Sequence, residues 1–225
     1  HRGQRDKVRK NQKPANRYRS FSPIALIRFI RRASIFFAAN PVRFPAAFNP
    51  VHREAGTLKF ERRGEPLIIE QIPVGPFQMN SYIIGCEDTG EGIYIDPGAE
   101  VDRVLGAAKR LEVRLTHLVG THAHLDHAEG VAEAKKKLGL PYLLHEAELH
   151  NLRNMPAAAR NYGFPEPEVP EVDGYLAPGD DLAVGRIAFE IRLTDGHAPG
   201  NITLYLAGEN GEAGHAIVGD ALFAG

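Results

Sequence analysis

From about residue 67 onward, the chain alternates between short apolar runs and longer amphipathic stretches. The short runs are rich in β-branched and aromatic residues and are bounded by turn residues, which is typical of strands. We expect these strands at 67–72, 81–84, 92–95, 117–120, 142–144, 187–193, 202–207 and 216–219. Apolar residues recur at helical spacing at 101–112, at about 127–138 and at 146–153, and the five prolines within 155–178 predict a loop. This order of elements predicts an α+β fold with helices packed outside the sheets.

The first 63 residues differ in composition from the rest of the chain. Residues 1–63 contain 16 Lys and Arg against 3 Asp and Glu, a net charge of +13, whereas residues 64–225 contain 11 against 25, a net charge of −14. We therefore expect two parts: a basic, largely disordered segment over 1–63, and a folded domain over 64–225 whose first strand begins near Leu67. Within the basic segment, Ser22 can cap a short amphipathic helix that ends near Asn40.

Three interpretations of that basic helix remain open. It can be a targeting or membrane-surface helix, a stretch that docks on the domain, or non-native coding sequence ahead of a mis-assigned start. No run of about 18 apolar residues occurs, so no transmembrane helix is expected. The single cysteine, Cys86, excludes an intrachain disulfide and is interpreted as a small core or loop residue. It suits a reducing compartment, so we expect a cytoplasmic protein, with organellar targeting by the basic segment as the alternative.

The segment 121–127 concentrates metal-ligand chemistry in one loop. It holds His122, His124, Asp126 and His127 between an expected buried strand and an expected helix. In an extended segment, His122 and His124 point the same way because side chains alternate with a period of two, so both can bind one cation. After the chain turns, Asp126 and His127 can face a second cation. Imidazole nitrogen and carboxylate oxygen are ligands that Zn²⁺ accepts, and iron and manganese accept similar sets.

Two later loops carry further candidate ligands. His197 lies in a glycine- and proline-containing loop after the strand 187–193, and Asp220 follows Gly219 at the end of another expected strand, where it could bridge two cations. Each is a weak signal alone, because such turns are common. Together with the first loop, they indicate a binuclear metal site at the ends of several strands. Four further histidines are interpreted as surface or packing residues: His52, His145, His150 and His215.

Three motifs resemble those of the metallo-β-lactamase-fold superfamily, and most closely those of its glyoxalase II-like hydrolases. They are His122-x-His124-x-Asp126-His127, Gly196-His197-x-Pro199-Gly200 and Gly219-Asp220-x-Leu222-Phe223, with further matches at Asn80-Ser81-Tyr82 and Asp96-Pro97-Gly98. The resemblance runs from about residue 68 to residue 225 and is not specific to a substrate. It implies an αββα sandwich with the site at one edge of the two sheets.

The resemblance also implies a set of ligands. His122, His124 and His197 would hold the first metal, Asp126 and His127 the second, and Asp220 would bridge the two. It further implies one more histidine for the second metal, beyond residue 225. We therefore expect the fold to be truncated at its C-terminal end and the second of two Zn²⁺ sites to be incomplete in the chain as written, with iron or manganese as alternatives.

The expected activity is hydrolysis of a small-molecule thioester or ester, with acyl-glutathione as the first candidate, by a hydroxide that bridges two metal ions. Asp126 is the candidate catalytic residue, because it would help to orient that hydroxide; no substrate-binding residue is predicted. Three alternatives remain: a sulfur (persulfide) dioxygenase with one iron, a nuclease, and an inactive fragment or structural module. Nucleic acid is not favoured, because residues 64–225 are acidic, although the basic segment could attract phosphate.

Overall fold

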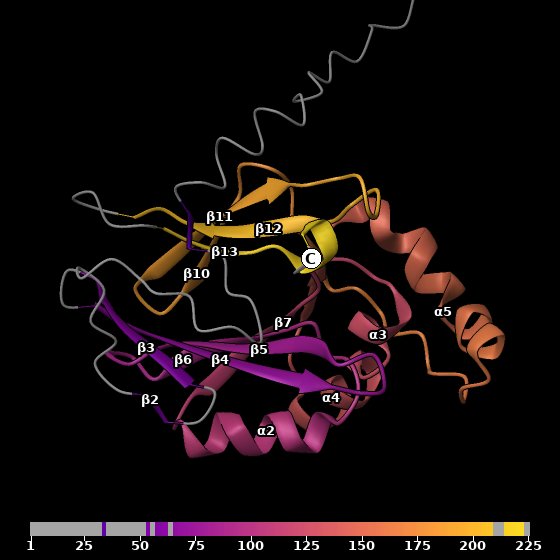
Figure 1. Cartoon of the computed structure of the whole chain (residues 1–225), viewed down its shortest axis with the longest axis horizontal. Helices are drawn as coiled ribbons and strands as arrows, with labels where there is room; N and C mark the ends of the chain where they lie inside the picture. Colours follow the sequence, from indigo (N-terminus) through magenta and orange to yellow (C-terminus); the bar gives the residue numbers. More distant parts are fainter. Residues whose placement is uncertain (1–32, 35–52, 55–56, 63–64, 209–213, 223–225) are drawn as a thin grey trace, which may run out of the picture.

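The computed structural model describes residues 33–34, 53–54, 57–62, 65–208 and 214–222, with side chains from residue 67 onward. Two β-sheets face each other (Figure 1). The larger sheet has the order β2 (Arg53–Glu54), β3 (Thr57–Arg62), β4 (Glu65–Val74), β5 (Met79–Cys86), β6 (Glu91–Ile95), β7 (Arg114–Val119), β8 (Tyr142–Leu144), β9 (Gly174–Tyr175). The smaller sheet has the order β1 (Ala33–Ser34), β13 (Gly214–Ile217), β12 (Ile202–Leu206), β11 (Ile187–Leu193), β10 (Asp181–Val184).

The described helices pack around the larger sheet. They are α2 (Val101–Arg110), α3 (Leu125–Ala128), α4 (Val131–Leu138) and α5 (Leu149–Tyr162), with short 3₁₀ turns η1 (Glu146–Glu148) and η2 (Gly219–Ala221). In Figure 1, α2 and α4 lie below the larger sheet and α5 lies at the right-hand end of the sandwich. The α+β class and the two-sheet sandwich are confirmed. All eight expected strands are present, with ends that differ by a few residues.

Two apolar layers hold the sandwich together, one between the larger sheet and the helices and one between the two sheets. The central strands of the larger sheet are therefore buried on both faces. In β4, Ile68 packs toward the helices and Ile69 toward the smaller sheet, and Ile83 and Ile84 of β5 repeat this alternation. A strand covered on both faces reads as a continuous apolar run, which explains the pattern found in the sequence. Cys86 is a fully buried member of the layer between the sheets.

The expected helix 127–138 is wrong in one respect, because the structure breaks it into α3 and α4 at Gly130. The Gly130 amide donates to the Pro97 carbonyl oxygen at 2.9 Å. A Cβ atom on Gly130 would lie 1.9 Å from the Gly98 carbonyl oxygen. The break thus lets the loop after β6 pack directly on the backbone at the start of α4, beside the segment that carries the candidate ligands.

Gly130→Ala is expected to lower the free energy of unfolding by about 1–3 kcal/mol, because backbone would have to move to accommodate the methyl group. Gly106→Ala provides the matched control, since a Cβ there meets nothing within 4 Å. That position is in the interior of α2, where alanine should raise stability by about 0.5–1 kcal/mol. Chemical denaturation of both variants measures the difference; equal effects would contradict the close packing at Gly130.

The expected loop over 155–178 is wrong for its first eight residues, because α5 continues through Pro156 to Tyr162, and at Gly174–Tyr175, which form β9. Proline inside a helix removes a backbone hydrogen bond and costs about 3 kcal/mol. One face of α5 offsets this cost by burying Leu152, Met155 and Ala159 against the core. The helix ends at Gly163, which adopts φ 74°, a left-handed conformation that glycine tolerates best.

The N-terminal predictions are only partly covered by the structure. The larger sheet begins before the expected Leu67, because β3 pairs with β4 along its whole length. The expected amphipathic helix lies outside the described residues except at Ala33–Ser34, which form a strand paired with β13, so the helix is wrong at these two positions. The division of the chain at residue 63 and the expected C-terminal truncation stay predictions. None of the described helices has the length and apolar character needed to span a bilayer.

Candidate metal centre

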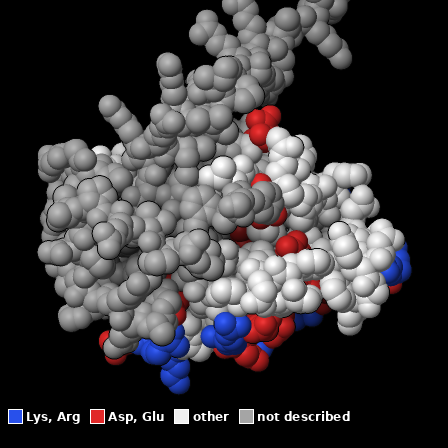
Figure 2. All heavy atoms as spheres, in the orientation of Figure 1, with Lys and Arg blue, Asp and Glu red and all other residues white. Residues whose placement is uncertain are grey.

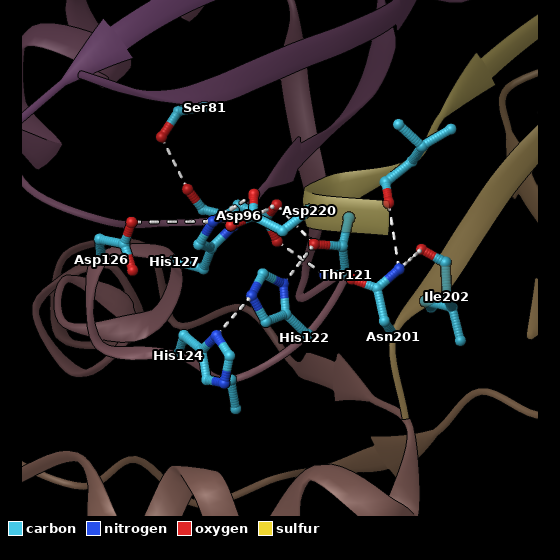
Figure 3. A network of polar contacts seen from close by, with 12 residues as sticks. Ser81, Asp96, Thr121, His122, His124, Asp126, His127, Asn201, Ile202 and Asp220 are labelled. Carbon is cyan, nitrogen blue, oxygen red and sulfur yellow. Dashed lines mark hydrogen bonds and ion pairs between the residues drawn. The ribbon is translucent and has the colours of Figure 1, made fainter. Parts of the chain in front are cut away.

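Loops from both sheets meet at one edge of the sandwich. Strands β6 and β7 are parallel neighbours, so Asp96 and Thr121, which follow them, come to the same edge. Strands β11 and β13 both run antiparallel to β12, so the segments after them, with His197 and Asp220, also share an edge. The Ile202 amide donates to the Thr121 carbonyl oxygen at 2.9 Å and joins the two edges. The fold thereby gathers the three loops that carry the candidate ligands; Figure 3 shows His122, His124, Asp126 and His127 of the first loop near Asp220 and near Asn201.

Three histidines form the first cluster of candidate ligand atoms. His122, His124 and His197 each offer one ring nitrogen, and these atoms lie within 4.8 Å of one another. The Nδ1 atom of His124 is 3.2 Å from Nε2 of His122 and 2.8 Å from Nε2 of His197. Three imidazole nitrogens that converge in this way can share one cation.

A second cluster shares His122 with the first. It contains His122, His127 and Asp220, again with ligand atoms within 4.8 Å. One carboxylate oxygen of Asp220 is 3.2 Å from Nε2 of His127, and the other is 3.5 Å from Nε2 of His197. Asp220 therefore lies between the clusters, where a bridging ligand would lie. Asp126 is at the side of the second cluster, with Oδ2 3.9 Å from Nε2 of His127, and belongs to neither three-residue group.

The unpaired ring nitrogen of His127 tests whether these residues fit a metal. The His127 ring is buried, and its Nδ1 atom lies 3.0 Å from Oδ2 of Asp96. Its Nε2 atom has no hydrogen-bond partner of acceptable geometry among the described residues, although Asp220 is close. Buried polar atoms without a partner are costly and uncommon. A cation at the second cluster would supply the missing partner, so the donor set fits a divalent metal.

The histidines differ in the direction in which their surroundings shift the pKa. Burial and the neighbouring imidazoles hold the pKa of His122 far below its usual value, and they lower the pKa of His124 in the same direction. Burial also acts to lower the pKa of His127, but the carboxylates of Asp96, Asp220 and Asp126 outweigh it and raise that pKa to about 10. Neutral imidazoles are ready to bind a cation, whereas a metal at His127 must displace a proton.

Asp96 orients the second cluster, a role that the sequence analysis did not assign to it. Its side chain is 1% exposed. The Thr121 amide and hydroxyl donate to its two oxygens at 2.6 and 2.7 Å, and Oδ2 also holds the ring of His127. By binding Nδ1, Asp96 directs Nε2 of His127 toward the candidate ligands. The sequence did contain one signal for this role, because Asp96 directly follows the expected strand 92–95, just as the candidate ligands follow the expected strand 117–120.

Asn201 fixes the loops of the smaller sheet, and sequence reasoning missed it as well. The side chain is completely buried, and its amide nitrogen donates to Oγ1 of Thr194 at 2.9 Å and to the Val218 carbonyl oxygen at 3.0 Å (Figure 3). It therefore connects the end of the His197 loop to the strand that precedes Asp220. Gly219 allows the two sheets to approach here, because a Cβ atom on it would lie 2.4 Å from Oγ1 of Thr121.

The remaining described histidines lie outside both clusters, including His117 of β7, whose Nδ1 atom is 3.1 Å from Oγ1 of Thr116. His145 accepts a hydrogen bond from the Ala147 amide through Nδ1, and His150 is exposed on α5. His215 is buried in β13. His52 lies outside the described residues. Within the part of the chain that the structure describes, the two clusters above are the groups suited to a metal.

Comparison with known proteins places these clusters in a family context. A family model described as the metallo-beta-lactamase superfamily matches residues 74–225. Hydroxyacylglutathione hydrolase GloC of Haemophilus influenzae is 31% identical over 164 residues, which cover 70% of this chain and 73% of that protein. The mitochondrial persulfide dioxygenase ETHE1 of Bos taurus is 28% identical over 161 residues, which cover 71% of this chain but only 54% of that longer protein.

A solved structure agrees with this result. The crystal structure of TTHA1623 in a di-iron-bound form superimposes with a TM-score of 0.52 at 31% sequence identity. The match covers 60% of this chain and 65% of that chain. This chain therefore shares its fold with the solved relative, whereas the activities named for GloC and ETHE1 differ from each other.

Proposed function

The chain belongs to the metallo-β-lactamase superfamily, and we propose that it is a binuclear metal-dependent hydrolase of thioesters of the acyl-glutathione type. The observation that carries the proposal is the pair of ligand clusters that share His122, with Asp220 between them. Two adjacent clusters suit two metal ions better than one. The substrate class is supported by the similarity to the hydroxyacylglutathione hydrolase GloC.

The two clusters support the proposed ligand set, to which we add Asp126 because its Oδ2 atom lies 3.9 Å from Nε2 of His127. His122, His124 and His197 would hold one cation, His127 and Asp126 the other, and Asp220 would be shared. Bound divalent cations supply Lewis acidity and lower the pKa of coordinated water, which hydrolysis at neutral pH requires. We propose Zn²⁺ because imidazole and carboxylate groups suit it, while iron remains the alternative given the di-iron structure of the relative.

The protein side chains then have distinct tasks. Asp126 is the proposed catalytic residue: its side chain is 28% exposed, so its carboxylate can reach both the second cluster and a water molecule beside the substrate. Asp96 keeps His127 in the orientation that leaves Nε2 toward the site. A thioester suits this arrangement, because a thiolate leaves without a general acid and the site need not supply a proton.

A persulfide dioxygenase is the second candidate, for a specific reason. The cluster of His122, His127 and Asp220 is a set of two imidazoles and one carboxylate, which is the ligand set of many non-haem iron oxygenases. The similarity to ETHE1 is consistent with it. A nuclease is less favoured: on the face in Figure 2, the described Lys and Arg side chains lie mainly along the lower and right-hand edges, beside acidic ones. A nucleic-acid surface needs a continuous basic patch.

Metal analysis and paired activity assays test the proposal. The purified chain is expected to contain zinc, to hydrolyse an S-(2-hydroxyacyl)glutathione, and to lose this activity when a chelator removes the metal. Oxygen consumption is measured in parallel with a thiol persulfide as substrate. Oxygen uptake with bound iron and no thioester hydrolysis would contradict the hydrolase and support the dioxygenase.

A further inference from the structure

Glu148 is a buried carboxylate that contacts both loops of the three-histidine cluster. Its side chain is completely buried at the junction of η1 and α5. Oε2 accepts a hydrogen bond from the Ala123 amide at 2.9 Å, and Oε1 accepts one from the Gly200 amide at 2.7 Å. The side-chain amide of Asn151 donates to Oε2 at 2.9 Å and fixes the carboxylate itself.

These contacts link residues that flank all three ligands. Ala123 lies between His122 and His124, and Gly200 follows His197 by three residues in the loop between β11 and β12. The first loop follows β7 of the larger sheet, whereas the second joins β11 and β12 of the smaller sheet. One carboxylate therefore connects the two sheets at the point where their histidines converge.

The arrangement is not explained by the stability of α5 alone. Glu148 is the N-cap residue of α5, yet its side chain makes no capping hydrogen bond with that helix. It instead accepts backbone hydrogen bonds from residues 25 and 52 positions away in the sequence. The approach is tight, since a Cβ atom on Gly200 would lie 3.0 Å from Cγ of Glu148. The carboxylate thus accepts backbone hydrogen bonds from the two loops, and its contact with its own helix is the side-chain bond from Asn151.

We propose that Glu148 is a positioning residue that holds the loops of His122, His124 and His197 at the separation that one cation requires. The role rests on the proposed metal-dependent function. Its negative charge has a second consequence, because it lies near enough to His124 to act on that ring electrostatically. A buried carboxylate close to the cluster favours a bound cation there.

Glu148→Gln tests this role with the whole chain. The amide keeps the shape of the side chain but offers one acceptor oxygen, so its NH₂ group must face either the Ala123 or the Gly200 amide. We expect the affinity for Zn²⁺, measured by competition with a chromophoric chelator, to fall about 10–100-fold. The visible spectrum of the Co²⁺-substituted protein should also change, and in the metal-free protein the Ala123 and Gly200 amides should exchange hydrogen faster.

Glu70→Gln is the matched control. Glu70 is also a buried glutamate, 4% exposed, but it pairs with Arg110 at 2.8 Å and lies outside both ligand clusters. This variant should lose stability while it retains the Zn²⁺ affinity and Co²⁺ spectrum of the wild type. If Glu148→Gln fails to fold, Asn151→Ala removes one bond to the carboxylate and should weaken Zn²⁺ binding by roughly three- to tenfold.

The outcomes separate this role from the proposed function. Wild-type affinity and amide exchange in Glu148→Gln, or wild-type affinity in Asn151→Ala where Glu148→Gln does not fold, would overturn the role of Glu148 alone. A wild-type chain that binds neither Zn²⁺ nor iron would overturn the metal-dependent function, and the role of Glu148 with it. A loss of affinity and of amide protection in Glu148→Gln, with neither change in Glu70→Gln, would support the proposal.

Discussion

His124→Ala is expected to lose most of the metal bound at the three-histidine cluster and to reduce kcat/KM by more than roughly 100-fold. Substitution of a residue that only orients a ligand lowers metal affinity or activity by about 10–100-fold, so substitution of a ligand itself should lower them further. His124 is central to the cluster, because its Nδ1 atom lies within 3.2 Å of ring nitrogens from both other histidines. Metal content by elemental analysis and turnover of the thioester measure the two effects.

His150→Ala is the control for this variant. It makes the same chemical change at an exposed histidine of α5 that contacts Asn154 and lies outside both clusters. The metal content and kcat/KM of this control should match the wild type. A His124→Ala protein that keeps both its metal and its turnover would show that the three-histidine cluster is not the catalytic metal site.

Asp96→Asn is expected to weaken metal binding at the second cluster by about 10–100-fold and to lower the free energy of unfolding by about 1–3 kcal/mol. The carboxylate accepts hydrogen bonds from the Thr121 amide and hydroxyl and also holds Nδ1 of His127. An asparagine has one acceptor oxygen, so at least one of these buried donors would face its NH₂ group. The ring of His127 would then lose its fixed orientation.

The negative charge of Asp96 also affects metal binding at the second cluster. Asp96 is the main cause that raises the pKa of His127, so its removal lowers that pKa and reduces competition from the proton. That change favours metal binding, whereas loss of the nearby negative charge disfavours it. Unchanged or tighter binding in Asp96→Asn would contradict the positioning role. Asp102→Asn, at an exposed side chain on α2 that pairs with Lys137, is the control and should leave metal titrations unchanged.

Local sequence determined the eight strands expected from it and most of the helices, but not the shorter strands β9 and β10 or the early strand β3. Branched apolar residues such as Ile68 and Ile83 favour extended structure, and neighbouring Ile69 and Ile84 fill the opposite layer, so β4 and β5 are specified by residues within them. The ligand-bearing segments could also be recognised, because His122, His124, Asp126 and His127 lie in one short loop. The sequence further indicated that His197 and Asp220 follow strands.

The tertiary structure decided the features that depend on contacts between residues far apart in the sequence. Pro156 predicted a loop, but burial of Leu152, Met155 and Ala159 outweighs the local cost of proline and extends α5. The break at Gly130 depends on a backbone contact with Gly98, more than thirty positions earlier in the chain. The contact at Gly130 leaves no periodic pattern in the local sequence, whereas the helical spacing of Leu152, Met155 and Ala159 does, although Pro156 argues locally against a helix.

Distance in the sequence also explains why the candidate ligands could be predicted and the residues that orient them could not. Ligands are recognised by type and spacing within a motif, whereas Asp96 and Glu148 act on partners 25 and 52 residues away, respectively. Aspartate and glutamate are common at turns and helix ends, so their residue type alone does not indicate burial. Their role follows only from the pairing of β6 with β7 and from the meeting of the two sheets at one edge. The sequence thus determined the chemistry of the site, and the fold decided its geometry, because geometry depends on contacts between distant segments.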